Sequence, residues 1–399
     1  MRITLCFIIF INLCISLFGQ VHFTRLNNED GLSHSEVKAI LQDSYGYMWI
    51  GTRNKLNRYD GCEFKVLDCY DPVANRRNNN IAALCEDANR LLWIGTDDGV
   101  FVYDPALETF TYLERWLNPD QSADFLYNWV SNIVADKEGN MWVVLPSRGI
   151  LKVNIQTKAY RLYSISEDTV FGKGGPLSLT VDEQGTIWAG CIEQGICRYD
   201  RKKDEFVRVL KETGMFQGKG VYTMLSYKEF LLIALHEGGL LKYNMDTKTL
   251  SLHDFPEVDK VMLRCLMMSK EEELWVGTNN GIYIYNVLTG SCTNVKNDSF
   301  DSHSLSNNTV TTMYTDREKG IWVGTLYGGL NYQSRSAENF TVYIPNDHPQ
   351  SVQSQWIHGL YWDEETQKLW VGTEDEGCSV FDKNMSVFTP VNTHPTVTV

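Results

Sequence analysis

A short sequence recurs along nearly the whole chain and limits its fold more than any other feature. Each copy reads as an apolar residue, Trp-Ile/Val-Gly-Thr, a short turn, Gly-Leu/Ile and then Tyr-Asp/Asn, and the better copies are preceded by Asp-x-x-Gly. Leu232 stands at the centre of one copy, and tryptophan at the centre of the others: Trp49, Trp93, Trp142, Trp188, Trp275, Trp322 and Trp370. The centres lie 43 to 49 residues apart. A fixed period of this length indicates a repeat architecture.

The residues inside each repeat favour strands over helices. Helical repeats need apolar residues every three to four positions, whereas these units have short β-branched and aromatic runs separated by Gly, Asn and Asp. Four strands fit one unit, which is the size of one propeller blade. In the second unit we expect strands at Ile81 to Glu86, Leu91 to Gly95, Val100 to Tyr103 and Thr109 to Leu113. The fold class is therefore all-β.

The two ends of the repeat region indicate how the ring closes. Propellers close when one end of the chain adds a strand to the blade formed by the other end, which removes free sheet edges. We predict that Phe23 to Leu26 completes blade seven, and that the similar Phe340 to Tyr343 opens a second ring. The expected fold is a seven-bladed β-propeller of four-stranded blades over residues 21–339, with residues 340–399 as the first blade of a truncated second propeller. An eighth blade of one ring is the alternative for residues 340–399.

The first 20 residues have the pattern of a signal peptide. Arg2 is followed by an apolar run that ends at Phe18, just before the small residue Gly19. A membrane anchor is the alternative, but the run is at the short end for crossing a bilayer. We expect cleavage near Gly19 or Gln20 and a periplasmic, exported product.

Charge excludes one class of partner. The chain carries a net charge of -14, and an acidic protein repels the phosphate backbone. We therefore expect no nucleic acid partner for these residues. The cysteines and histidines have no metal-ligand spacing, so we predict no metal and no cofactor, and the disulfide state stays open.

Carboxylates recur at equivalent turn positions, as in Asp43, Asp87, Asp136 and Asp182. Repetition around a ring is typical of structural turns, whereas an active site is one asymmetric set of residues. We predict no catalytic residue, and we expect the seven tryptophans to hold neighbouring blades together.

The turns that differ between copies are the better candidates for ligand binding. If the strands of each blade run alternately up and down, the turn between its second and third strands and the loop to the next blade emerge on one face. The long loops to the next blade add Arg76, Arg77, Trp116 and Trp129 to that face. Aromatic rings stack on sugars, and charged side chains bind their oxygens. The candidate ligand-binding residues are Arg53, Arg148, His236 and Tyr327.

The repeat Leu-x-Trp-Ile/Val-Gly-Thr-x-x-Gly-Leu-x-x-Tyr-Asp and the opening run from Phe23 to Ser33 resemble two-component regulator propeller repeats. These occur in the periplasmic sensor regions of hybrid two-component systems of glycan-degrading gut bacteria. The resemblance implies a sensor that binds an oligosaccharide and regulates glycan-utilisation genes. Its kinase, its DNA-binding part and its membrane attachment would lie in C-terminal segments absent from these residues, and the full-length sensor would be a homodimer.

Two other functions remain open. A stand-alone propeller of this kind could bind a partner protein through its variable face. A glycan lyase or hydrolase on the same scaffold is the second alternative.

Overall fold

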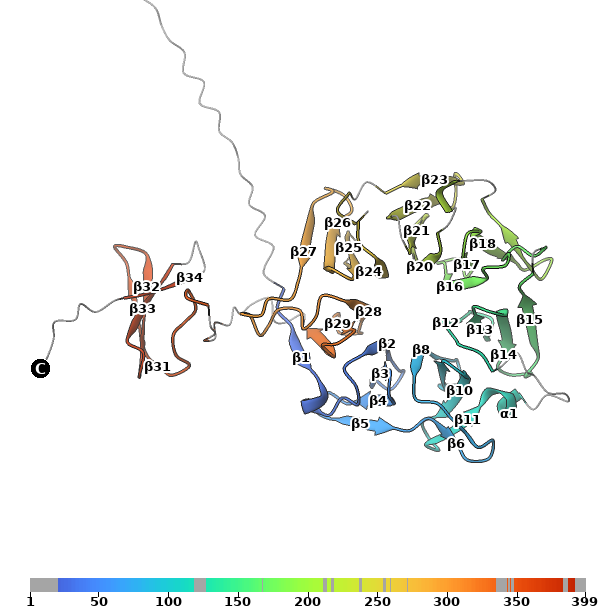
Figure 1. Cartoon of the computed structure of the whole chain (residues 1–399), viewed down its shortest axis with the longest axis horizontal. Coiled ribbons are helices and arrows are strands. Elements are labelled where there is room, and N and C mark those ends of the chain that lie inside the picture. The colour runs from blue at the N-terminus through green and yellow to red at the C-terminus, as the bar shows by residue number, and fades with distance from the viewer. Residues whose placement is uncertain are drawn as a thin grey trace, which may run out of the picture.

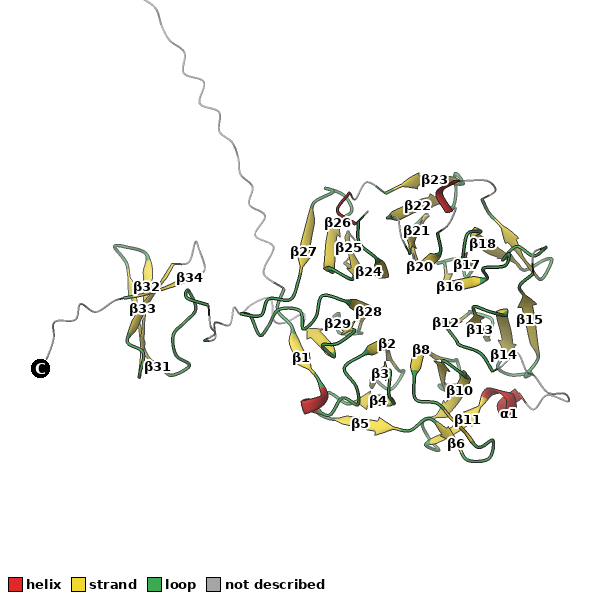
Figure 2. Cartoon of the chain, viewed as in Figure 1, coloured by secondary structure: helices red, strands yellow, loops and turns green. Residues whose placement is uncertain are grey.

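The computed structural model describes residues 21–117, 127–166, 168–210, 214–216, 219–236, 239–253, 256–258, 260–270, 272–334, 343, 345, 348–382 and 387–391. The signal peptide predicted for residues 1–20 lies outside this part of the chain. Figure 2 shows that strands dominate the described residues.

Seven four-stranded antiparallel sheets surround a common axis (Figure 1). The strands of the first four sheets are β2 (Val37–Gln42), β3 (Met48–Thr52), β4 (Leu56–Tyr59) and β5 (Phe64–Leu67); β8 (Ile81–Glu86), β9 (Leu92–Thr96), β10 (Gly99–Asp104) and β11 (Thr109–Tyr112); β12 (Asn132–Ala135), β13 (Asn140–Leu145), β14 (Gly149–Asn154) and β15 (Tyr160–Ser164); and β16 (Pro176–Val181), β17 (Ile187–Cys191), β18 (Gly195–Asp200) and β19 (Glu205–Arg208).

The next three sheets continue the ring. Their strands are β20 (Val221–Tyr227), β21 (Phe230–Leu235), β22 (Leu240–Asn244) and β23 (Thr249–Leu252); β24 (Leu263–Lys270), β25 (Glu273–Thr278), β26 (Gly281–Asn286) and β27 (Cys292–Val295); and β28 (Val310–Thr315), β29 (Ile321–Thr325), β30 (Leu330–Gln333) and β1 (Thr24–Leu26). The remaining elements beside the ring are β6 (Tyr70–Asp71), β7 (Arg76–Arg77), α1 (Leu113–Leu117), η1 (Asn28–Asp30), η3 (Gly214–Phe216) and η4 (Pro256–Val258).

The ring is closed by the first strand of the chain. β1 pairs antiparallel with β30, with Thr24 opposite Tyr332 and Leu26 opposite Leu330. The innermost strands contact one another in order around the axis, and the last of them, β28, contacts the first, β2. The all-β propeller is therefore confirmed, as is the prediction that residues 23–26 complete blade seven.

The strand limits in the second blade were all predicted to within one residue, but the helix that follows the last strand was not predicted. β8 begins and ends as expected, whereas β11 ends at Tyr112 and Leu113 begins the helix α1. Trp116 of this helix packs edge-on against Trp93, with ring centroids 5.2 Å apart. The expectation that Trp116 adds to the variable face is therefore wrong, because its ring fills space beside the blade core.

A recurring carboxylate fixes both the turn and the tryptophan of a blade. In blade one, Asp43 Oδ1 accepts hydrogen bonds from the Tyr45 and Tyr47 backbone N–H groups, while Oδ2 accepts one from the Trp49 indole at 2.7 Å. The same aspartate–indole bond occurs in blades two, three, four and seven at 2.8 to 2.9 Å. In blade six, Glu273 accepts the bond from Trp275 instead. These carboxylates serve the scaffold.

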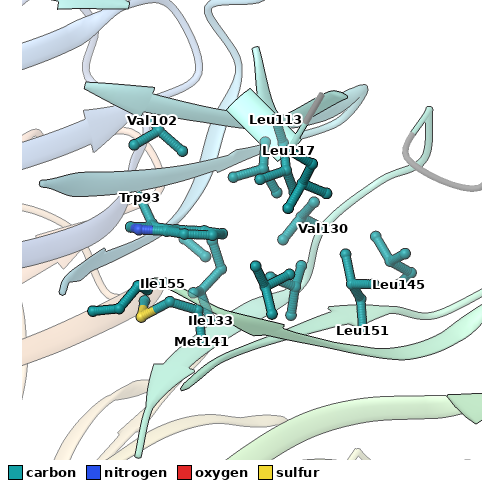
Figure 3. Close-up of a cluster of buried hydrophobic side chains, with 14 residues drawn as sticks. Trp93, Val102, Leu113, Leu117, Val130, Ile133, Met141, Leu145, Leu151 and Ile155 are labelled. Carbon is teal, nitrogen blue, oxygen red and sulfur yellow. The ribbon is translucent and has the colours of Figure 1, made fainter. Parts of the chain in front are cut away.

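The tryptophans lie between neighbouring blades. Trp93 of blade two packs in one buried cluster with Met141, Val143 and Leu151 of blade three (Figure 3). Trp322 of blade seven joins the cluster of Val37 and other residues of blade one in the same way. Each blade therefore depends on the next for the burial of its largest side chain.

In five blades of the ring, a glycine two residues after the tryptophan makes room for the next blade. A Cβ atom at Gly324 would lie 2.6 Å from Val37 Cγ1 and 2.7 Å from Thr312 Cγ2. Equivalent contacts join Gly51 to Ile81, Gly95 to Val130, Gly190 to Val221 and Gly277 to Val310. Contacts this close leave no space for a side chain, so glycine is required at these five seams, whereas Val144 and Ala234 stand at the same position in blades three and five.

This contact gives a prediction for ring closure. The substitution Gly324→Val is expected to lower the free energy of unfolding by about 1–3 kcal/mol, because it overpacks the seam between the last and first blades. Urea denaturation would measure the loss. The matched control is Gly372→Val in the eighth sheet, where the nearest atom to an added Cβ is Gly359 O at 3.7 Å. This control is expected to lose less stability, because the added side chain overpacks nothing. Equal losses of unfolding free energy for the two variants would contradict the claim that Gly324 is needed for the contact between blades seven and one.

The eighth sheet is separate from the seven ring sheets. It consists of β31 (Ile357–Asp363), β32 (Lys368–Thr373), β33 (Cys378–Asp382) and β34 (Val387–Pro390), in chain order. Its first strand, β31, corresponds to the innermost strand of a ring blade, and Leu360 and Tyr361 of this strand are 65% and 68% exposed. The predicted boundary at residue 339 and the predicted strand at 340–342 lie outside the described residues, while Tyr343 packs against Phe381 and Phe388.

Candidate functional site

The turn between the second and third strands of each blade lies on the same face as the loop to the next blade. Their backbones are joined: Lys55 N–H donates to Asn79 O, Gly281 N–H to Asn308 O and Gly329 N–H to Ser35 O. We call this the variable face, because its turns differ from blade to blade. The Asp-x-x-Gly turns lie on the opposite face.

Two of the candidate residues stand on adjacent blades. Arg53 follows β3 and forms an ion pair with Glu36 at 3.4 Å. Tyr327, between β29 and β30, is 72% exposed. Both are therefore open to a ligand from the variable face.

The other two candidates are on blades three and five. Arg148 is exposed in the turn before β14, where its backbone N–H donates to Leu145 O. His236 follows β21, and its ring lies 5.9 Å from that of Tyr222. Within the described residues, no hydrogen bond, ion pair or ring contact joins any two of the four candidates. The fold places them on one face but on alternate blades.

A set of residues that sequence reasoning missed lies on the innermost strands. In six ring blades the pairing of the first two strands shifts register after the first residue, which is the mark of a β-bulge. The bulged residues are Lys38, Ala82, Leu177, Tyr222, Arg264 and Thr311, and Ser131 has the equivalent place in blade three. We call these seven the axial residues. In the sequence, these residues are marked only by their place at the second position of the first strand of a blade. A β-bulge produces no periodic pattern from which it could be predicted.

The loop from β5 to β8 on the variable face is held by a buried carboxylate. Asp71 of β6 is fully buried and accepts hydrogen bonds from the Tyr112 backbone N–H at 2.8 Å and from Arg115 Nε at 2.8 Å. The backbone N–H groups of Val73 and Ala74 also donate to it. Asp71 therefore anchors the loop of blade one to blade two.

The charge on Asp71 makes this anchor sensitive to pH. Burial alone would raise the pKa of Asp71, but the hydrogen bonds from Arg115 and from the backbone outweigh it and hold the pKa below its ordinary value. A carboxylate with a lowered folded-state pKa stabilises the fold above the unfolded pKa of about 3.9 and loses that effect as the pH falls further.

We therefore expect Asp71→Asn to cost about 1.5–3 kcal/mol of stability at pH 7, and less at pH 3, which is below the unfolded-state pKa and where part of the stabilisation by the wild-type carboxylate is lost. Urea denaturation at the two pH values checks this. The control is Asp98→Asn on the neighbouring exposed turn, which should have a smaller effect. A loss for Asp71→Asn that is equal at both pH values would contradict an ionised anchor.

The remaining reactive groups have structural surroundings. Among the described residues, no group of three His, Cys, Asp or Glu side chains has the geometry of a metal site. Cys191 and Cys197 are buried as free thiols with their sulfur atoms 3.9 Å apart. Burial raises the pKa of Cys85 and of Cys265 to about 12, which keeps both as unreactive thiols.

Comparison with known proteins identifies the repeats. Residues 31–54, 75–98 and 304–327 match the two component regulator propeller family. A segment of 166 residues, 40% of this chain, is 26% identical to histidine kinase P4 of Formosa agariphila. The match spans 12% of that kinase.

Solved structures share the fold. The extracellular domain of a putative hybrid two component system from B. thetaiotaomicron superposes with a TM-score of 0.67 and 20% identity, over 94% of this chain and 55% of that one. The extracellular domain of a putative one component system from the same organism gives 0.65 and 20%, over 92% and 53%. This chain thus spans slightly more than half the length of these structures.

A propeller enzyme has the same fold. Virginiamycin B lyase from Staphylococcus aureus superposes with a TM-score of 0.58 and 11% identity, over 79% of this chain and 99% of that one. The fold by itself is therefore compatible with binding or with catalysis. No helix in the described part of the chain has the length and apolar character of a membrane span.

Proposed function

We propose that this chain, which carries two-component regulator propeller repeats, is the periplasmic, ligand-sensing region of a hybrid two-component system. The ligand is an oligosaccharide, and its binding regulates glycan-utilisation genes through a kinase and a DNA-binding part outside these residues. The observation that carries this proposal is the match of three repeats, placed on blades one, two and seven, to that family.

The use of side chains within the ring supports binding over catalysis. The recurring aspartates accept hydrogen bonds from turn amides and indoles, and are thereby committed to the scaffold. The variable face keeps exposed arginine, tyrosine and histidine side chains in turns on a rigid ring. Binding residues are commonly carried by loops on such a scaffold.

The eighth sheet supports a further part of the proposal, that residues 340–399 begin a second propeller. In the ring, each glycine after the tryptophan contacts a β-branched residue of the next blade, whereas Gly372 has no such contact. Strand β31 exposes Ile357, Leu360 and Tyr361. Burial of an apolar face of this kind requires another packed layer, and the next blade of the same chain would supply it.

Isothermal titration tests the ligand. Residues 21–399 are titrated with plant, host and microbial oligosaccharides, and binding of one class is the expected result. No binding to any of them would refute the sensor proposal. A lyase or hydrolase would instead consume the oligosaccharide during the titration, and chromatography of the recovered sugar detects its products.

A further inference from the structure

We propose that four axial residues on consecutive blades, Tyr222, Arg264, Thr311 and Lys38, form a binding site for an anionic sugar at the ring axis. The sugar would carry a carboxylate or a sulfate group. This inference rests on the proposed oligosaccharide sensor and names the chemical class of its ligand.

The position of these side chains follows from burial and from the bulge. Each of the seven axial residues is partly exposed and is preceded by a buried residue, such as Val37, Ile81 or Val310, that packs against the preceding blade. The innermost strand has no further strand on its other edge, so the ring axis is the open side. A bulge turns its residue out of the regular ladder.

Hydrogen bonds place several of these residues along the seams of the inner wall. Lys38 Nζ donates to Asn80 Oδ1 of the next blade at 2.8 Å, and Ser131 Oγ donates to Leu177 O at 2.7 Å. Thr311 Oγ1 donates to Val37 O across the closing seam. Each of these three axial side chains thus bonds across the seam to the next blade, and the Ser131 bond reaches another axial residue.

The charge of this set is opposite to that of the whole protein. The chain has 50 acidic and 36 basic residues, yet the axial residues include two cations, Lys38 and Arg264, and no carboxylate. The acid paired with Lys38 is Glu36, at 3.4 Å, and Glu36 is also 3.4 Å from Arg53, so this carboxylate is shared between two cations. Asn80, which accepts the hydrogen bond from Lys38, donates one to Asp97 on the adjoining turn.

Arg264 has an unused donor. Within the described residues, its Nε atom is buried and has no hydrogen-bond acceptor. A buried donor without an acceptor costs about 1–3 kcal/mol. Because Nε is closed to solvent in this structure, an anionic oxygen of a ligand would reach it only after the Arg264 side chain turns toward the axis. The guanidinium geometry is well suited to the charge-assisted hydrogen bond that would then form.

The aromatic part of the site is on the adjacent blade. Tyr222 is 39% exposed, and its ring lies beside that of His236. An exposed aromatic ring one blade away from the cation Arg264 fits a sugar ring that carries a negative group. The axial residues of blades two to four, Ala82, Ser131 and Leu177, have no charge, so the site occupies one side of the axis.

The test uses residues 21–399 and isothermal titration with three probes: an oligogalacturonate, a chondroitin sulfate oligosaccharide and a neutral cello-oligosaccharide. The expected result is that one of the two anionic probes binds more tightly than the neutral one, and which of them binds separates carboxylate from sulfate recognition. Lys38→Gln and Arg264→Gln are each expected to weaken that binding about 10-fold. Lys202→Gln, which removes an exposed cation on the opposite face, should change it less than 2-fold.

The two proposals fail in different ways. If a neutral oligosaccharide binds as tightly as the anionic probes, or if the axial variants bind an anionic probe as well as wild type, the axial site is wrong and the sensor proposal stands. If no saccharide of any class binds, both are wrong. Should Arg264→Gln fail to fold, Lys38→Gln and the salt dependence of wild-type binding decide the matter. Added salt screens exposed cations, so wild-type binding that is unchanged by salt would rule out the axial cations as its source.

Discussion

Replacing Trp93 with alanine is expected to lower the free energy of unfolding by about 3–5 kcal/mol, because the indole is fully buried between blades two and three. The substitution also leaves Asp87 Oδ2 without the indole hydrogen that it accepts at 2.9 Å. Both losses occur at one blade interface, so we expect the midpoint of urea denaturation to fall sharply.

The same substitution at another repeat is the control. Trp370 occupies the equivalent place in the eighth sheet but is 36% exposed. Trp370→Ala should therefore leave the unfolding midpoint of the ring nearly unchanged. Similar losses for the two variants would show that tryptophan stabilises each sheet by itself and not the contact between blades.

Removing residues 21–26 is expected to destabilise the ring by more than about 4 kcal/mol. The deletion removes Phe23, which is 1% exposed, and truncation of a buried phenylalanine alone costs about 3–5 kcal/mol. It also removes the hydrogen bonds from Arg25 to the Asp301 and Ser304 carbonyl groups and leaves the edge of β30 unpaired. Denaturation and limited proteolysis of residues 27–399 would measure the effect.

Removing residues 387–399 tests whether this effect is specific to closure. That deletion removes β34, an outer strand of the same kind, from the eighth sheet. We expect the ring to keep its unfolding midpoint and its resistance to protease. The milder variant Phe23→Ala should lose about 3–5 kcal/mol, and a wild-type midpoint for it would contradict closure through β1.

Much of the fold follows from the sequence because each blade repeats the same local rules. The Asp-x-x-Gly turn, the tryptophan and the glycine mark strand ends and blade interfaces, and β1 was predictable because it resembles an outer strand without a blade. The helix α1 was missed, since Leu113 to Leu117 is a single turn too short for a helical pattern, and packing of Leu113 and Leu117 against blade three favours the helix.

The candidate site was harder to predict. Residues in turns, such as Arg53 and Tyr327, are found by aligning the repeats and asking where the copies differ. The axial residues lie inside strands, where variation between copies is easily taken for drift. The axial residues come together at the ring axis only because the strand pairing shifts register and because the ring closes. Neither feature can be predicted from a short stretch of sequence.

Closure by β1 also has a consequence for the order of folding. The partner of Arg25 at Ser304 is 279 residues away in the chain, and contacts of such long sequence separation form late. During synthesis the first strand must remain unpaired until the seventh blade exists, while the intermediate blades form from local hairpins. A folding intermediate with six blades and two open edges is therefore expected, and it would be the species most vulnerable to aggregation.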